Sequence, residues 1–214
     1  MHVGRMNRET YSHPITSTMS TTAIILAAGP SSRLGRPKQL LPWGGPTLLG
    51  KVVAETRAWP VDSLWVILGS RFEEVLESVD LGDVGVVENP EWEEGMASSL
   101  RVGLDVASRD PSTEAAFVVM GDQPGIDLSV VEALLEHRKT SDALAIVPKY
   151  RYVRGHPVLF ARPLWSRLMS LEGDQGGRNL LKAHPEWVEE IWFEDLPPRD
   201  VDTSDDVRDL QPRE

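Results

Sequence analysis

The segment TAIILAAGPSSRLGRPKQLL, residues 22–41, joins a short apolar run to a basic segment rich in glycine and serine. The run up to Ala28 has the length and composition of a buried parallel strand. Gly29 and Gly35 let the backbone turn tightly and approach a ligand closely. In open α/β sheets, ligands bind where the chain leaves the carboxyl ends of the strands. The segment therefore predicts a binding loop directly after the first strand.

The charges of this loop indicate an anionic ligand. Arg33, Arg36 and Lys38 lie close together in the sequence, and Ser31 and Ser32 add hydroxyl groups. Backbone N–H groups and basic side chains in such a loop can hold a polyphosphate. The sequence fits neither the Walker A pattern nor Gly-x-Gly-x-x-Gly, so neither motif supports an ATPase or a dinucleotide-binding protein. An exposed turn with solvated charges is the alternative interpretation.

Strands and helices alternate along the rest of the chain, as is typical of βαβ units around a mostly parallel sheet. We expect further strands at residues 64–68, 84–87, 115–120, 143–147 and 188–193, and helices at 47–59, 72–79, 96–108, 128–139, 163–169 and 204–210. A hairpin is expected over residues 149–161, with its turn near residues 154–155. Thr203 is expected to cap the last helix, with Asp206 as a loose capping-box partner.

Length and composition restrict the possible classes of protein. The chain has 214 residues and no cysteine, which excludes disulfides, thiolate metal sites and cysteine nucleophiles. The formal charge of −11 argues against a nucleic-acid partner. No apolar run reaches the roughly 18 residues that a membrane helix needs. We expect a disordered leader at residues 1–20, which lacks the apolar region of a secretory signal, and a single domain at residues 21–214.

The loop resembles the nucleotide-binding signature of the MobA-like nucleotidyltransferases, in which Leu-Ala-Ala/Gly-Gly is followed by Ser-Ser-Arg-x-Gly and Pro-Lys. Further stretches are similar to the branch that transfers cytidylyl groups to the molybdenum cofactor, namely ENPEWEEGMASSL at 88–100, GDQP at 121–124, GHPVLF at 155–160 and GDQGGR at 173–178. The resemblance covers roughly residues 22–210. It implies a three-layer, Rossmann-like α/β nucleotidyltransferase fold, with a mostly parallel central sheet and helices on both faces.

The resemblance also implies roles for residues of the loop. Leu26, Ala27, Ala28, Gly29, Ser31, Ser32, Arg33 and Lys38 would bind the nucleotide, with Arg33 and Lys38 holding the triphosphate during catalysis. The guanylyl-transferring branch carries Leu-Ala-Gly-Gly, whereas this chain carries Leu-Ala-Ala-Gly. The methyl group of Ala28 would crowd the base pocket and favour a smaller pyrimidine, so CTP is the expected nucleotide.

Two aspartates are candidate ligands of Mg²⁺. Asp122 follows an apolar strand, where a carboxylate can either hold the metal or cap a turn. The resemblance identifies it as the metal ligand and a catalytic residue. Asp202 is the candidate second ligand, since relatives of this fold place an acidic or amide group late in the chain. Its alternative is a solvated acidic tail.

The remaining candidates lie in the other matching stretches. Ser98 and Ser99 open a helix, where they can either cap it or contact the base and ribose. The resemblance places His156, Asp174 and Arg178 near the acceptor, although Arg178 could equally form a surface ion pair. The implied acceptor is molybdenum-bound molybdopterin, and the further implied partner is an apo-molybdenum hydroxylase or its maturation factor, in the cytoplasm. A sugar- or polyol-phosphate nucleotidyltransferase and a non-catalytic cofactor carrier are the alternatives.

Overall fold

A computed structural model describes residues 20–210. One sheet of eight strands crosses the molecule, with the order β3-β2-β1-β4-β7-β5-β6 and with β8 paired to β5. The strands are β1 (Ser20–Leu26), β2 (Ser63–Leu68), β3 (Gly85–Glu88), β4 (Thr113–Met120), β5 (Ala145–Tyr150), β6 (Val153–Arg154), β7 (Val158–Ala161) and β8 (Val188–Phe193). The pairs β1–β2, β1–β4, β2–β3 and β5–β8 are parallel, while β6 and β7 run antiparallel to their neighbours.

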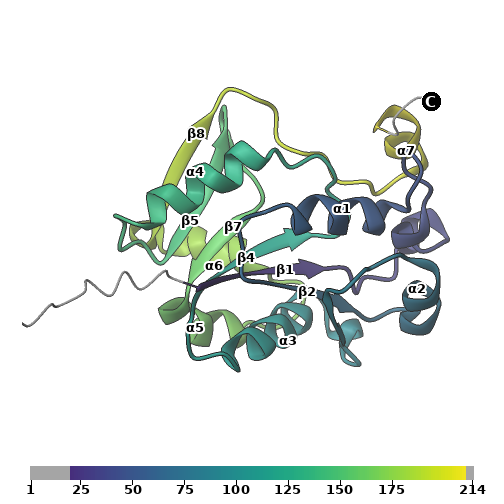
Figure 1. Ribbon diagram of the computed structural model, residues 1–214, viewed down its shortest axis with the longest axis horizontal. Coiled ribbons are helices and arrows are strands. Elements are labelled where there is room, and N and C mark those ends of the chain that lie inside the picture. Colours follow the sequence, from purple (N-terminus) through teal and green to yellow (C-terminus); the bar gives the residue numbers. More distant parts are fainter. Residues whose placement is uncertain (1–19, 211–214) are drawn as a thin grey trace, which may run out of the picture.

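Helices cover both faces of this sheet, and Figure 1 shows α1 and α4 on one side with α3 and α5 on the other. The helices are α1 (Leu48–Arg57), α2 (Phe72–Ser78), α3 (Met96–Ser108), α4 (Leu128–Arg138), α5 (Trp165–Met169), α6 (Gly177–Ala183) and α7 (Ser204–Leu210). Residues 20–210 also contain five short 3₁₀ turns, at Ser32–Leu34, Lys38–Leu40, Trp92–Glu94, Arg162–Leu164 and Pro185–Trp187. The expected α/β architecture is confirmed. The leader predicted at residues 1–20 lies outside the described part, apart from Ser20, which begins β1.

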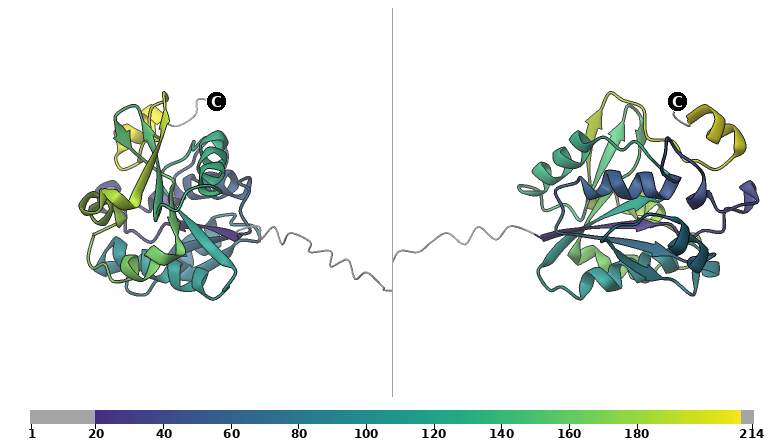
Figure 2. Two further views of the ribbon diagram at one scale, coloured as in Figure 1. Left: turned by 90° about the vertical axis from the view of Figure 1, so that its left-hand side faces the viewer. Right: turned by 45° about the vertical axis from the view of Figure 1, so that its right-hand side comes forward.

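Alternating apolar side chains of the strands build two core layers. Ile25 and Phe117 lie in the layer under α1 and α4, whereas Ile24 and Ala116 lie in the layer over α3 and α5. Because successive strand residues point to opposite faces, each strand contributes to both layers. A third, small core joins residues before and within α1 to Val201 near the C-terminus. In Figures 1 and 2, α7 accordingly lies beside the segment that follows β1.

The predicted hairpin turn at residues 154–155 is wrong. The chain turns at Arg151 and Tyr152, between β5 and β6, and Arg151 takes a positive φ of 52°. Gly155 serves close packing instead, since a Cβ there would come within 2.8 Å of the Tyr150 ring. The sequence prediction also missed α6, which directly follows a glycine-rich segment. In residues 20–210, no helix is both long and apolar enough to span a membrane.

Candidate functional site

A pocket of about 200 Å³ opens at the carboxyl ends of β1 and β4. Its walls come from the end of β1 and the loop after it, from Trp92 and the start of α3, from the end of β4 and the segment after it, and from the segment before α6. The lining residues are Leu26, Ala27, Ala28, Gly29, Pro30, Lys38, Gln39, Trp92, Gly95, Met96, Ser99, Met120, Gly121, Asp122 and Asp174. Neighbouring parallel strands end at the same edge of a sheet, so their loops meet there. The predicted binding loop and the predicted metal ligand Asp122 are therefore brought together.

The loop after β1 is held in shape by the buried side chain of Gln39. Its amide nitrogen donates to the carbonyl oxygens of Ala27, at 2.8 Å, and Gly29, at 3.0 Å. The hydroxyl of Ser31, a residue with a φ of 55°, accepts the N–H of Lys38 at 2.9 Å. These bonds join residues 38–39 at the end of the loop to residues 27–31 at its start. Ser32 is exposed, and the side chain of Arg33 lies outside the described atoms.

Lys38 joins the two predicted metal ligands. Its ammonium group donates to Asp122 and, at 3.1 Å, to Asp202 Oδ1. Burial alone lowers the pKa of Lys38, but the charges of the two carboxylates and their hydrogen bonds outweigh burial and raise it. Lys38 is therefore charged, and two carboxylates that lie far apart in the sequence share one cation.

Asp122 is almost fully buried, at 6% exposure, in the turn after β4. Gly121 allows this position, because a Cβ there would lie 2.7 Å from that of Ala27. Burial raises the pKa of Asp122, Lys38 opposes this increase, and the charges of Asp200 and Asp202 add to it. The Oδ1 atom of Asp122 is buried and has no hydrogen-bond partner among residues 20–210. A buried carboxylate oxygen with an open lone pair suits a divalent cation.

The described residues contain no group of three or more histidine or acidic side chains arranged to hold a metal ion. Two carboxylates, those of Asp122 and Asp202, are nevertheless enough for Mg²⁺, which often binds through one or two carboxylates together with substrate phosphates and water. Asp202 is brought to the site by its neighbours. The N–H of Val201 donates to the Asp122 carbonyl oxygen at 3.1 Å, and Gln123 donates to Asp200.

The start of α3 forms another wall of the pocket. Ser99 lines the pocket, whereas the hydroxyl of Ser98 donates to the carbonyl oxygen of Gly95 at 2.8 Å. Asn89, which is fully buried, donates to both serine hydroxyls at 2.8 and 3.0 Å. Ser98 thus has a clear structural role here, while Ser99 is placed to reach a ligand.

His156 lies beside β4 and is not among the residues that line the pocket. Its Nδ1–H donates to the Val118 carbonyl oxygen at 3.3 Å. Burial lowers the pKa of the imidazole, although this hydrogen bond and the charges of Asp200 and Asp122 act in the opposite direction. The ring is therefore neutral near pH 7 and keeps Nε2 as an acceptor.

The glycine-rich segment closes the pocket against α3. The Gly173 carbonyl oxygen accepts the N–H of Ala97 at 3.0 Å, and Asp174 lines the pocket beside Gly95. Arg178 is exposed on α6, and no ion pair holds it within the described part of the chain. The structure thus brings Asp174 to the nucleotide loop, while Arg178 lies on the surface nearby in the sequence.

Sequence reasoning overlooked Gln39 and Asn89 as organisers of the site. Both stand inside motifs that resemble the family, but their importance depends on which backbone or hydroxyl groups their amides reach. It also overlooked Trp92, Met96 and Met120, which complete the pocket wall. The available signal was their position, since Trp92 and Met96 lie within the matching stretch at residues 88–100 and Met120 directly precedes the stretch at 121–124.

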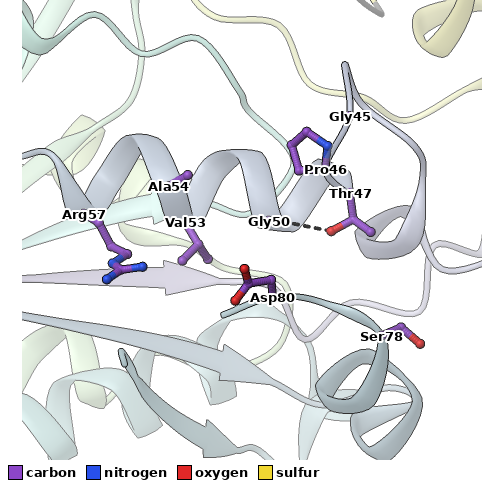
Figure 3. Close-up of a pocket in the computed structure, with 9 residues that line it drawn as sticks. All are labelled: Gly45, Pro46, Thr47, Gly50, Val53, Ala54, Arg57, Ser78 and Asp80. Carbon is purple, nitrogen blue, oxygen red and sulfur yellow. Dashed lines mark hydrogen bonds between the residues drawn. The ribbon is translucent and has the colours of Figure 1, made fainter. Parts of the chain in front are cut away.

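A larger pocket, of about 340 Å³, lies between α1 and the segment after α2 (Figure 3). Its charged lining residues are Arg57 and Asp80. Arg57 is paired with Asp83 at 2.6 Å, and Asp80 accepts the N–H of Gly82 at 3.1 Å. Since both charges are already engaged, the smaller pocket at the sheet edge is the stronger candidate.

Several known proteins are similar to this chain over most of its length. The chain is 32% identical over 192 residues to nicotine blue oxidoreductase of Paenarthrobacter nicotinovorans, covering 86% of this chain and 88% of that protein. It is 26% identical over 184 residues to the molybdenum cofactor cytidylyltransferase of Escherichia coli (strain K12), covering 86% and 91%. The structure of Rv0371c from Mycobacterium tuberculosis H37Rv in complex with manganese aligns with a TM-score of 0.78 and 31% identity, covering 90% and 98%.

Residues 23–188 match the model of a family described as the MobA-like NTP transferase domain. This range contains every residue that lines the sheet-edge pocket and ends before Asp202. The chain therefore belongs to the MobA-like NTP transferase domain family.

Proposed function

We propose that the protein transfers CMP from CTP to the phosphate of molybdenum-bound molybdopterin and releases pyrophosphate. The observation that carries the proposal is the convergence of Lys38, Asp122 and Asp202 at the pocket formed by the loop after β1. The similarity to a molybdenum cofactor cytidylyltransferase supports the choice of substrates.

In this reaction an oxygen of the acceptor phosphate attacks the α-phosphorus of CTP. The bond from that phosphorus to the bridging oxygen breaks, and pyrophosphate takes the electron pair. A phosphate is already ionised at neutral pH, so the reaction needs no strong general base. The protein then contributes position and positive charge. Lys38 and Arg33 are the residues proposed to hold the triphosphate and the departing pyrophosphate.

Asp122 and Asp202 are the proposed ligands of Mg²⁺, and the partnerless Oδ1 of Asp122 supports the first of them. When bound, the metal would neutralise the charge that develops on the phosphate oxygens. Lys38 would then be free to turn from the carboxylates toward the triphosphate.

The preference for CTP rests on Ala28, which lines the pocket and is 4% exposed. Its methyl group is proposed to crowd the base and to favour a pyrimidine over a larger purine. Calorimetric titration with CTP and GTP in the presence of Mg²⁺ tests this, and tighter binding of GTP would overturn the preference.

His156, Asp174 and Arg178 are the proposed contacts for the acceptor. The two alternatives on the same scaffold are a sugar- or polyol-phosphate nucleotidyltransferase and a carrier of the finished cofactor. Release of pyrophosphate with sugar 1-phosphates but not with molybdopterin would favour the first. A carrier would keep its function in Asp122→Asn, whereas a transferase would lose most pyrophosphate release.

A redox reaction is the second candidate function, because the relative at 32% identity is named an oxidoreductase. The same pocket would then bind a nucleotide cofactor instead of CTP. Oxidation of NADH or NADPH in the presence of an organic dye, with no binding of CTP, would favour this candidate.

A further inference from the structure

Asp206, in the first turn of α7, contacts the backbone of Asp202. Its carboxylate accepts three hydrogen bonds through Oδ2, from the Thr203 N–H at 2.9 Å, the Thr203 hydroxyl at 2.7 Å and the Asp202 N–H at 3.2 Å. The Thr203 hydroxyl in turn accepts the N–H of Asp206 at 3.2 Å. The expected capping box is therefore present, and it extends one residue further than a capping box requires.

The extra bond fixes the residue whose side chain reaches the catalytic lysine. Asp202 Oδ1 lies 3.1 Å from Lys38 Nζ, while the Asp202 backbone is held by Asp206. On its other side, Val201 is fully buried and packs with Leu41, Trp43 and Leu48. The chain is thus anchored immediately before and after Asp202.

Asp206 differs from the other acids of α7. Its side chain is 20% exposed and receives Arg199 at 3.2 Å, whereas the side chain of Asp205 is 77% exposed and pairs with Arg208. Arg199 lies before Asp202 in the chain and Thr203 lies after it, so Asp206 contacts the chain on both sides of Asp202.

We propose that Asp206 is a positioning residue that holds Asp202 in reach of the metal and of Lys38. The proposal rests on the metal-ligand role given to Asp202 under the proposed function. It predicts that loss of Asp206 weakens metal binding only through Asp202.

Binding of Mn²⁺ to the full chain without nucleotide, followed by electron paramagnetic resonance, provides the test. Asp202→Ala and Asp206→Ala should each raise the Kd about tenfold, the range typical of residues that orient metal ligands. The double variant should bind no more weakly than Asp202→Ala alone, because both changes remove the same interaction. Asp206→Asn, which keeps an acceptor oxygen, should stay within about threefold of the parent protein.

Two control variants separate positioning from helix capping. Asp205→Ala removes an exposed acid from the same turn and should leave the Kd unchanged. Thr203→Val removes the capping hydroxyl but leaves the bond from Asp202 to Asp206, so it should lower Tm and leave the Kd within about twofold. Weakening by Thr203→Val equal to that by Asp206→Ala would overturn the proposal, and so would additive effects in the double variant.

The same measurements distinguish this inference from the proposed function. If Asp202→Ala leaves the Kd unchanged, the ligand role of Asp202 is wrong and the inference falls with it. If the coupling appears but CTP is never converted to pyrophosphate, Asp206 keeps its positioning role and the transfer reaction is wrong.

Discussion

Single side chains set the shape and charge of the pocket. Gln39 satisfies two carbonyl oxygens of the loop after β1, and Lys38 balances two carboxylates that would otherwise repel each other. Buried polar groups of this kind are costly to leave without partners. Gln39 therefore permits a prediction about the stability of the chain, and Lys38 permits one about the binding of ligands.

Replacing Gln39 by methionine, which has a similar size, should destabilise the protein by about 1–3 kcal/mol, because the carbonyl oxygens of Ala27 and Gly29 lose a buried donor. Urea unfolding measures the change. Gln175→Met, at an exposed position in the glycine-rich segment, is the matched control and should be neutral. Equal stability of the two variants would contradict the role of Gln39.

Lys38→Met should have opposite effects on two ligands. Without nucleotide, Mn²⁺ should bind at least about threefold more tightly, because the ammonium no longer competes for Asp122 and Asp202. Binding of CTP with Mg²⁺ should weaken by about tenfold or more, since Lys38 is proposed to hold phosphate. Calorimetry measures both. Lys51→Met, on the surface of α1, should change neither, and an unchanged affinity of Lys38→Met for CTP would count against the phosphate role.

The residues that carry charge could be predicted from the sequence, whereas those that organise them could not. Lys38 could be singled out because it is a basic residue in a glycine- and serine-rich loop, and Asp122 because it is a carboxylate directly after a strand. Gln39 and Asn89 act through amides that reach backbone carbonyls or serine hydroxyls, and no periodic pattern marks such contacts. Asp202 lies 164 positions after Lys38 in the sequence, so its place beside Lys38 depends on the folding of the whole intervening chain.

Among the secondary-structure elements, several could be bounded from apolar patterning or, for α7, from the capping signal at Thr203. The bounds of α3, β8 and α7 agree with the sequence prediction. The hairpin turn was misplaced because Gly155 was taken as the turn residue, whereas the structure uses Arg151 at a positive φ. Helix α6 was missed because two glycines, which are poor helix formers, stand at its start.

The contact between α3 and the glycine-rich segment should depend on Gly95. Its φ is 102°, and a Cβ there would lie 2.5 Å from the Gly173 carbonyl carbon and 2.7 Å from the Asp174 nitrogen. Gly95→Ala should therefore displace residues 173–174, weaken binding of CTP and cost more than the roughly 1–3 kcal/mol of backbone strain alone.

Gly125→Ala isolates the strain from the clash. Gly125 has a φ of 85°, but nothing lies within 4 Å of an added Cβ. This variant should lose stability and keep its affinity for CTP, as measured by urea unfolding and calorimetry. If both variants bind CTP equally well, the closure of the pocket by residues 173–174 is not needed for the nucleotide.

At the scale of the whole molecule, one sheet and one C-terminal segment assemble the site. The family match ends at residue 188, yet Asp202 returns to the pocket because Val201 enters a small core with residues next to the loop after β1. The formal charge of −11 is compatible with an anionic substrate, because cations are concentrated in that loop. The fold class could be predicted from alternating strands and helices, but the return of the C-terminal segment depends on long-range packing.

Release of pyrophosphate with each of the four NTPs, with and without molybdenum-bound molybdopterin, tests the central claim most directly. We predict release with CTP only when the acceptor and Mg²⁺ are present, and a loss of about 100-fold or more in Asp122→Asn. Release that requires GTP, that proceeds without molybdopterin, or that persists in Asp122→Asn would contradict the account.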